Sequence, residues 1–273
     1  MALTTFQRSI IQRLARRRLD SGESYLAGGA TLNEFLAATR ISRDVDLFHD
    51  TESALDASWQ DDRRTLEEDG FTVRVIRERT SFVEAEVIRG GESVLLQWVR
   101  DSAYRFFPLV QHPELGLALH PFDLATNKIL ALVGRLEVRD WVDTIECGER
   151  LQPLGYLAWA ACGKDPGFSP LALIEHGARS ARYSAEEVQM LDFAGSPPDA
   201  GDLSRRWHLQ LASARAIIAS LPPEEAGKCV LDHAGRLVRV PAASLSGMIE
   251  RDEVRFHAGA IRGAFPQIQI PGP

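Results

Sequence analysis

Cysteine is scarce in this sequence. Three cysteines occur among 273 residues, and no two of them form a Cys-x-x-Cys pair. A small, odd number of widely separated cysteines argues against a disulfide framework and against a zinc ribbon. We therefore expect Cys147, Cys162 and Cys229 to be reduced thiols in a cytoplasmic protein.

Long apolar runs are also missing. No stretch approaches the roughly 18 residues that a membrane-spanning helix needs. Arginines interrupt the first 20 residues, where a secretory signal would carry its apolar core. We expect a cytoplasmic protein with no membrane partner. The net charge of -7 argues against a protein that coats nucleic acid with its whole surface, although it allows a local basic patch.

The order of hydrophobic patterns predicts an α+β fold in two parts. Residues 1–120 read as a mixed β-sheet with helices, and residues 121–273 as a mainly helical C-terminal domain. The expected helices of the first part are 5–19, 30–38 and 53–69, and its expected strands are 24–27, 45–48, 71–76, 81–88 and 93–99. The expected helices of the second part are 123–133, with Asp123 as its N-cap, 137–149, 153–162, 171–192 and 203–220, followed by a hairpin within 228–240.

The most informative stretch runs from a glycine pair to an aspartate pair. Gly28 and Gly29 separate an expected strand from an expected helix, which lets a backbone approach phosphates closely and directs helical amides at them. Asp44 and Asp46 are two residues apart on an expected strand, so their carboxylates share a face while Val45 points to the core. Facing carboxylates are costly without a cation, and carboxylates are suitable ligands for Mg²⁺. Each pair alone is a weak signal, since glycine pairs form ordinary turns and aspartates often face solvent.

The same residues carry a family resemblance. Gly28-Gly29-Ala30-Thr31 followed by Arg43-Asp44-Val45-Asp46 resembles the nucleotidyltransferase fold superfamily. Within it, the chain is similar to the AbiEii/AbiGii abortive-infection toxin family. That family has a lysine-bearing helix followed by an Arg-Asp-x-x-Asp helix start, which Lys128 and residues 139–143 match. The resemblance covers roughly residues 5–160.

The resemblance implies a metal-dependent nucleotidyltransferase that moves a nucleoside monophosphate from a nucleoside triphosphate (NTP) to a hydroxyl. Mg²⁺ or Mn²⁺ would bind to Asp44 and Asp46, and Lys128 would contact the triphosphate or support the site. The acceptor would be RNA, such as a tRNA 3′ end, or a protein, and the enzyme would be the toxin partner of an antitoxin protein. The residues implied in nucleotide binding are Gly28, Gly29, Ala30, Thr31, Arg43 and Arg139.

The C-terminal candidates also have plainer interpretations. Lys128 lies on an otherwise apolar helix, where a lysine needs a partner or a route to solvent. Its ammonium could extend to solvent, although the resemblance favours a cation directed at an anionic cleft. Arg139 and Asp143 are spaced as a helical ion pair, and Asp140 suits a first helical turn.

One position departs from the family pattern. A third carboxylate usually faces the aspartate pair from a neighbouring strand, and here Gln97 takes that place. Glutamine offers a carbonyl oxygen but no negative charge. Asp101 or Glu86 could substitute, although Glu84 and Glu86 could also line a solvated face. Two alternatives therefore stay open: a catalytically silent nucleotide-binding scaffold on this fold, and a nucleotidyltransferase that modifies a small molecule such as an antibiotic.

Overall fold

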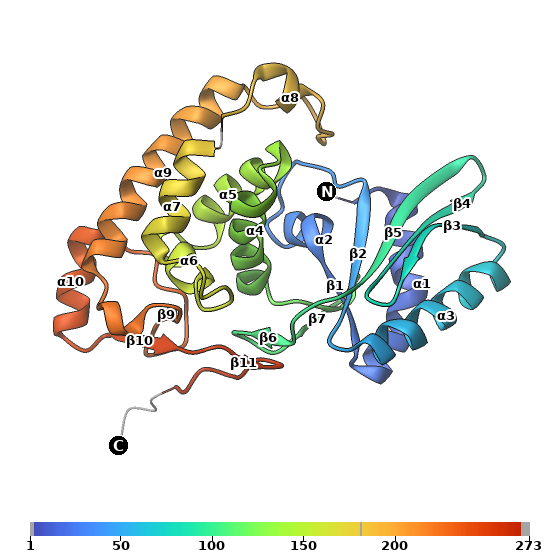
Figure 1. Cartoon of the computed structure of the whole chain (residues 1–273), viewed down its shortest axis with the longest axis horizontal. Helices are drawn as coiled ribbons and strands as arrows, with labels where there is room; N and C mark the ends of the chain where they lie inside the picture. The colour runs from blue at the N-terminus through green and yellow to red at the C-terminus, as the bar shows by residue number, and fades with distance from the viewer. Residues whose placement is uncertain (1–2, 181, 269–273) are drawn as a thin grey trace. The chain divides into compact units, whose positions relative to one another are not determined.

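The structure is a computed structural model that describes residues 3–180 and 182–268 (Figure 1). The chain forms two compact units. Unit 1 consists of Met1–Ala103, Leu109–His120 and Asp192–Gly195, and unit 2 of Tyr104–Pro108, Pro121–Leu191 and Ser196–Pro273. A single division at residue 120 would not separate these units, because Tyr104–Pro108 belongs to unit 2 and Asp192–Gly195 belongs to unit 1.

Unit 1 is built on a seven-stranded sheet with the order β3-β4-β5-β2-β1-β8-β7. β2 pairs with β5, and β1 with β8, in parallel, while the other neighbours are antiparallel. The mixed sheet that the sequence predicts is therefore present. The strands are β1 Ser24–Ala27, β2 Asp44–His49, β3 Thr72–Arg79, β4 Phe82–Arg89, β5 Glu92–Arg100, β7 Val110–His112 and β8 Gly116–Ala118.

Two helices cover one face of this sheet. Phe6, Ile10 and Leu14 of α1 (Thr5–Ser21) belong to the same buried core as Leu55 and Trp59 of α3 (Glu52–Glu68). The inward residues of the strands complete this core: Val45, Leu47, Val83, Ala85, Val87, Val94, Leu96 and Trp98. A third helix, α2 (Gly28–Phe35), follows β1 directly.

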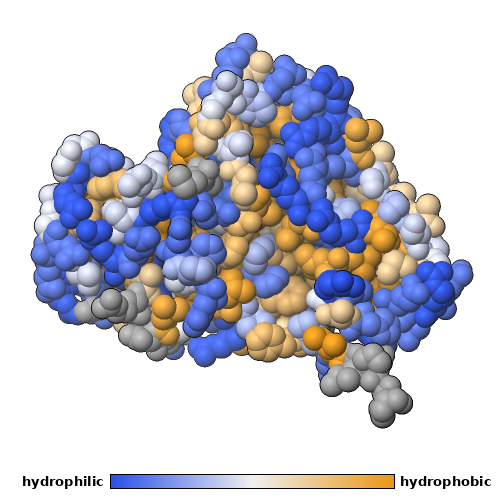
Figure 2. Space-filling model, turned by 180° about the vertical axis from the view of Figure 1, so that it is seen from behind, coloured by the Kyte–Doolittle hydropathy of each residue, from blue (hydrophilic) through white to orange (hydrophobic). Residues whose placement is uncertain are grey.

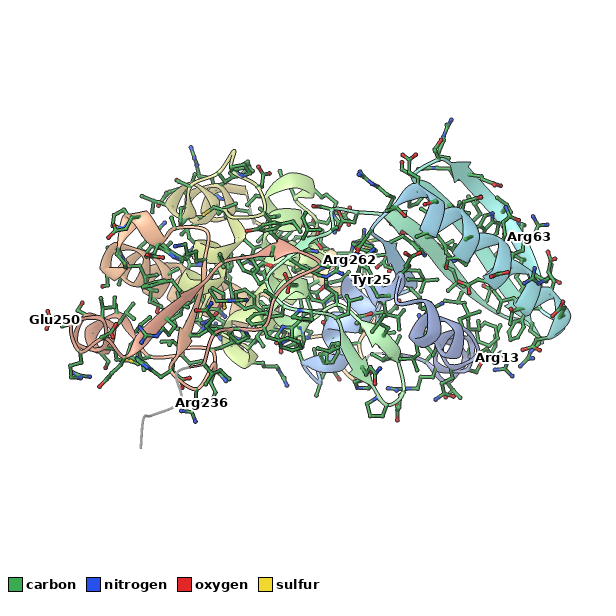
Figure 3. All side chains as sticks on the ribbon, turned by 90° about the horizontal axis from the view of Figure 1, so that it is seen from below. Arg13, Tyr25, Arg63, Arg236, Glu250 and Arg262 are labelled. Atoms are coloured by element: carbon green, nitrogen blue, oxygen red, sulfur yellow. The ribbon has the colours of Figure 1, made fainter. Side chains whose placement is uncertain are left out.

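The outer surface of these helices is polar. Figure 3 labels Arg13 on α1 and Arg63 on α3. The guanidinium of Arg13 lies over the ring of Phe71 and pairs with Asp69, and Arg63 pairs with Glu67. These arginines therefore cover hydrophobic residues and form surface ion pairs. Hydrophilic residues also occupy much of the face that Figure 2 shows.

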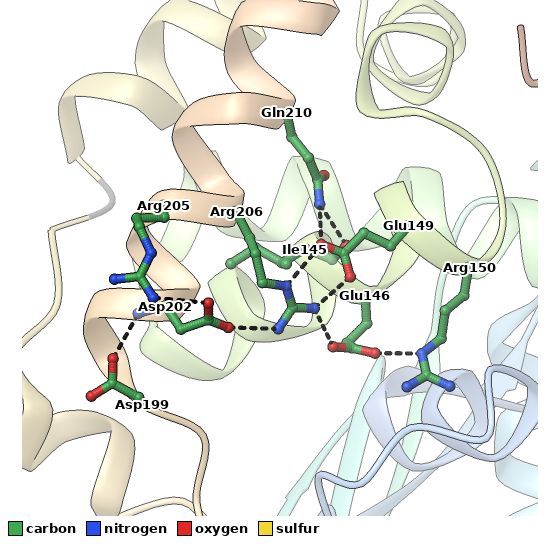
Figure 4. Close-up of polar contacts among 9 residues, drawn as sticks. All are labelled: Ile145, Glu146, Glu149, Arg150, Asp199, Asp202, Arg205, Arg206 and Gln210. Carbon is green, nitrogen blue, oxygen red and sulfur yellow. Dashed lines mark hydrogen bonds and ion pairs between the residues drawn. The ribbon is translucent and has the colours of Figure 1, made fainter.

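Unit 2 is mainly helical. Its most buried helix is α6 (Leu154–Ala161), all eight residues of which are buried. Arg206 of α9 (Ala200–Ser220) pairs with Glu146 and Glu149 of α5 (Val138–Arg150), which ties the two helices together (Figure 4). The other elements are β6 Tyr104–Arg105, α4 Pro121–Arg135, α7 Pro170–Ser180, α8 Ala185–Gln189, the 3-10 helix Pro223–Glu225, β9 Cys229–Asp232, α10 Ala242–Glu250, β10 Val254–His257 and β11 Ala260–Ile261.

Several expectations for the second part are wrong in detail. The single helix expected over 171–192 is two helices, α7 and α8, and residue 181 between them lies outside the described residues. β9 pairs with β10, whereas the hairpin expected within 228–240 is reduced to one bridge between Leu231 and Leu237. Asp123 lies inside α4 and accepts hydrogen bonds from the backbone of Phe106 and Phe107, so it does not cap the helix. In residues 3–180 and 182–268, none of the helices combines the length and the apolar composition that a membrane span requires.

Candidate active site

The glycine turn and the aspartate strand are in direct contact. Ala27, the last residue of β1, is the register partner of Asp46 on β2, so Gly28 begins beside that carboxylate. Gly28 has a positive φ of 70°, which side-chain-bearing residues rarely adopt. A Cβ atom at this position would lie 1.6 Å from Asp46 Oδ2. Only glycine therefore allows this backbone to approach Asp46 so closely.

The two aspartates share one face of β2, as the sequence predicts. Burial alternates along the strand: Val45 and Leu47 are buried in the core, whereas Asp44 and Asp46 are half-buried on the opposite face. Ser42 donates a hydrogen bond from Oγ to Asp44 Oδ1 over 2.7 Å. The two carboxylates are therefore held on the sheet face that lies away from the core of α1 and α3.

The oxygens of this pair fit Mg²⁺ in type and number. Magnesium in phosphate-transfer sites is held by one or two carboxylates, together with waters and the phosphates of the substrate. Among the residues that the structure describes, no group of three or more His, Cys, Asp or Glu side chains forms a metal-sized cluster. A divalent cation on Asp44 and Asp46 would therefore take its remaining oxygens from other groups, the triphosphate foremost.

Gln97 lies beside Asp46 on the neighbouring strand. The parallel pairing of β2 and β5 makes these two residues register partners. On the far side of Gln97, the antiparallel pairing of β5 and β4 places Glu84 in register. Gln97 donates a hydrogen bond from Nε2 to Glu84 Oε1 over 2.9 Å. The three side chains thus form a row across the sheet, all half-buried on the same face.

The other two carboxylates considered from the sequence have their own contacts. Glu86 is in register with Leu95, not with Gln97, and it pairs with Arg74 of the edge strand β3. Asp101 follows the end of β5, and its backbone amide donates to the carbonyl oxygen of His49. Of Glu84, Glu86 and Asp101, Glu84 is therefore the one that accepts a hydrogen bond from Gln97.

Arg43, which immediately precedes Asp44, is held by a distant acid. Its Nε lies 2.5 Å from Asp192 Oδ2, and its NH2 lies 3.4 Å from Asp192 Oδ1. Two backbone hydrogen bonds fix the same segment, from the Ile41 amide to the Asp192 carbonyl and from the Ala194 amide to the Thr39 carbonyl. The hydrogen bond from Arg43 lowers the pKa of Asp192. No pattern near either residue in the sequence identifies Asp192 as the partner of Arg43.

Ala30 and Thr31 lie in the first turn of α2. Both residues are buried as a whole, backbone included, each with 1% exposure. Gly28 is the partly exposed residue of this turn, so a phosphate would approach the beginning of the helix at Gly28.

His49 at the end of β2 faces the core. It is fully buried, and its Nδ1–H donates to the carbonyl oxygen of Val99 over 3.3 Å. Burial is the main cause that lowers the pKa of His49 to about 4. His49 is therefore a neutral core residue.

The remaining candidates belong to unit 2, where Lys128 is buried between acids. Its Nζ lies 2.8 Å from Asp140 Oδ1 and 3.1 Å from Asp143 Oδ2, and both aspartates are fully buried. Arg135 makes two further hydrogen bonds to Asp140. Arg139 pairs with Glu137. Residues 128, 140 and 143, which the family resemblance singles out, thus form one ion cluster that joins α4 to α5.

Comparisons with known proteins support the fold. No family model and no curated protein matches the chain. Among solved structures, a proposed nucleotidyltransferase from Helicobacter pylori is 14% identical, with a TM-score of 0.50 over 78% of this chain and 95% of that one. The nucleotidyltransferase toxin MenT4 from Mycobacterium tuberculosis is 14% identical, with a TM-score of 0.49 over 80% of this chain and 84% of that one. The chain has an α+β, nucleotidyltransferase-like fold, and its chemistry has to be argued from the site itself.

Proposed function

We propose that the protein is a metal-dependent nucleotidyltransferase whose metal ligands are Asp44 and Asp46. The observation that carries this proposal is the contact between Gly28 and the Asp46 carboxylate. A glycine that leaves room for a carboxylate, at the start of a helix, brings backbone amides and acidic oxygens to one point. A metal–triphosphate complex needs both kinds of group, the amides for its phosphates and the acids for its cation.

The reaction joins an acceptor hydroxyl to the α-phosphorus of the NTP. The acceptor oxygen forms the new bond, the bond between the α-phosphorus and its bridging oxygen breaks, and pyrophosphate leaves with that electron pair. The hydroxyl proton passes to a carboxylate or to water. Bound Mg²⁺ or Mn²⁺ would neutralise the triphosphate and polarise the hydroxyl. Asp44 and Asp46 would hold the cation, and the beginning of α2 at Gly28 would face the phosphates.

Lys128 has a supporting role in this proposal. Its ammonium already has two buried carboxylates within 3.1 Å. A direct contact with the triphosphate would compete with these ion pairs. We therefore assign Lys128 to holding α4 against α5, and we expect its replacement to affect stability before it affects NTP binding.

The acceptor and the biological role rest on resemblance. Similarity to the AbiEii/AbiGii abortive-infection toxins suggests a hydroxyl of RNA, such as a tRNA 3′ end, or of a protein as the acceptor. It also suggests a toxin that is paired with an antitoxin protein. The solved structure of a nucleotidyltransferase toxin with this general fold is compatible with that role.

The test is a transfer assay with the whole chain. Purified protein is incubated with each α-labelled NTP, Mg²⁺, and total cellular RNA or protein. Asp46→Asn is compared with Asp56→Asn, which removes an exposed carboxylate from α3. We expect transfer by the wild type and by Asp56→Asn. The transfer rate of Asp46→Asn should fall at least about 100-fold, because Asp46 is proposed to hold the cation that stabilises the transition state.

Two other outcomes would point elsewhere. Mg²⁺-dependent NTP binding without transfer would favour a silent nucleotide-binding scaffold, for which the neutral Gln97 beside Asp46 is the specific observation. Transfer to small hydroxyl compounds, but not to RNA or protein, would favour an antibiotic-type enzyme. The absence of both NTP binding and transfer would contradict the proposed function.

A further inference from the structure

Gln97 occupies the middle of a row of three side chains. Asp46 is its register partner on β2, and Glu84 is its register partner on β4. Because directly paired residues in a sheet point to the same face, the amide of Gln97 has one carboxylate on each flank. The two ends of this amide differ, since nitrogen donates hydrogen bonds and oxygen accepts them.

The contact with Glu84 determines which way the amide faces. A carboxylate only accepts hydrogen bonds, so the amide nitrogen must be the end that meets Glu84. The distance of 2.9 Å from Gln97 Nε2 to Glu84 Oε1 is that of a well-formed hydrogen bond. With the nitrogen directed at β4, the carbonyl oxygen Oε1 is left for the opposite flank, where Asp46 lies.

We infer that Glu84 is a positioning residue that turns the carbonyl oxygen of Gln97 toward the metal held by Asp44 and Asp46. This inference rests on the proposed function. The metal would then have oxygen ligands from three residues: the charged carboxylates of Asp44 and Asp46, and the neutral amide of Gln97. Amide oxygens are known ligands of hard cations. A carboxylate that accepts a hydrogen bond from a metal-binding side chain commonly fixes the orientation of that side chain.

The neighbouring acid provides a matched comparison. Glu86 is on the same strand and the same face as Glu84, but it is in register with Leu95 and pairs with Arg74. A general electrostatic effect of the acidic strand would involve Glu84 and Glu86 alike. An effect that acts through the amide of Gln97 would involve Glu84 alone.

The experiment measures Mn²⁺ binding by electron paramagnetic resonance, with and without a non-hydrolysable NTP analogue. The variants are Glu84→Ala, Glu84→Gln, Glu86→Ala and the exchange Gln97→Glu with Glu84→Gln. We expect Glu84→Ala to weaken Mn²⁺ binding about tenfold. Glu84→Gln should retain most of the affinity, since its carbonyl oxygen still accepts the hydrogen bond. Glu86→Ala should change the affinity less than about twofold.

The exchange variant gives the sharpest result. It places a third carboxylate beside Asp46, held by an amide donated from position 84, and it should bind Mn²⁺ more tightly than the wild type. Equal affinities for Glu84→Ala and Glu86→Ala would overturn this inference while leaving the proposed function intact. Failure of the wild type to bind Mn²⁺ with the analogue would overturn both.

Discussion

The backbone of Gly28 and the carboxylate of Asp46 lie closer together than any side chain at position 28 would permit. Gly28 begins α2 and Asp46 lies on β2, yet a Cβ added at position 28 would stand 1.6 Å from Asp46 Oδ2. This contact links the phosphate-binding turn to the metal-binding strand. Other glycines of the chain also have a positive φ but no atom near an added Cβ. Substitution of such a glycine therefore measures the cost of backbone strain without the contact with Asp46.

Gly28→Ala should disable the site more than it destabilises the fold. Gly22 has nearly the same φ, 66° against 70°, and no atom lies within 4 Å of its added Cβ. Both substitutions should cost roughly 1–2 kcal/mol of unfolding free energy from the left-handed backbone. Only Gly28→Ala should also displace Asp46 and weaken Mn²⁺ binding. The measurements are thermal unfolding and Mn²⁺ titration, and equal Mn²⁺ affinities in the two variants would refute the close-contact argument.

Lys128→Met should be strongly destabilising. It leaves the fully buried Asp140 and Asp143 without their ammonium, and breaking a buried pair from one side costs about 3–5 kcal/mol. Lys228→Met removes the lysine of a more exposed pair with Glu225 and should cost less than about 1 kcal/mol. Urea unfolding measures both. A small loss for Lys128→Met would instead favour a lysine directed at substrate.

His49 should make the protein less stable in mild acid. Burial lowers its folded pKa to about 4, below the ordinary 6.5. Between these values the unfolded chain binds a proton that the folded protein does not, so the free energy of unfolding falls as the pH drops from about 6.5 to about 4. The full effect is about 3 kcal/mol. Above pH 6.5 the contribution is constant.

The control for this pH dependence is His49→Gln, which keeps a donor for the Val99 carbonyl and removes the titration. Unfolding measured at several pH values should give a shallower slope in the variant, by up to about 1.4 kcal/mol per pH unit. An unchanged slope would show that other groups account for the acid sensitivity.

Asp192 should compete with the nucleotide for Arg43. Asp192→Asn removes the charge that holds the guanidinium, so NTP should bind more tightly, by no more than about fivefold because the pair is exposed. Arg43→Gln should weaken NTP binding, and adding Asp192→Asn to it should have no further effect. Isothermal titration with a non-hydrolysable analogue measures all four proteins. Weaker binding in Asp192→Asn would mean that the ion pair organises the loop instead of masking the arginine.

Local sequence patterns were sufficient to predict the strand of the aspartate pair and the glycine turn beside it. Alternation of apolar and polar residues over 45–48 predicts both the strand and the shared face of Asp44 and Asp46, and the structure has both. The glycine pair predicts the junction of β1 and α2. These features depend on residues that are close in sequence, where side-chain periodicity and backbone freedom act directly.

Contacts between distant residues were beyond the reach of such patterns. Asp192 is 149 residues from Arg43, and nothing near either residue identifies the other as its partner. Glu84 and Glu86 have the same alternation and composition around them, and only the register of β4 against β5 distinguishes the one that meets Gln97. Short strands such as β7 and β8 have three residues each, too few to show a period.

The exchange of short segments between the two units affects how the molecule can be divided. A fragment that ends at residue 120 would keep β6 while losing its partner β11, and it would keep Arg43 while losing Asp192. A cut at residue 120 would therefore remove part of each unit's own structure. Both fragments should fold less well than the units from which they come.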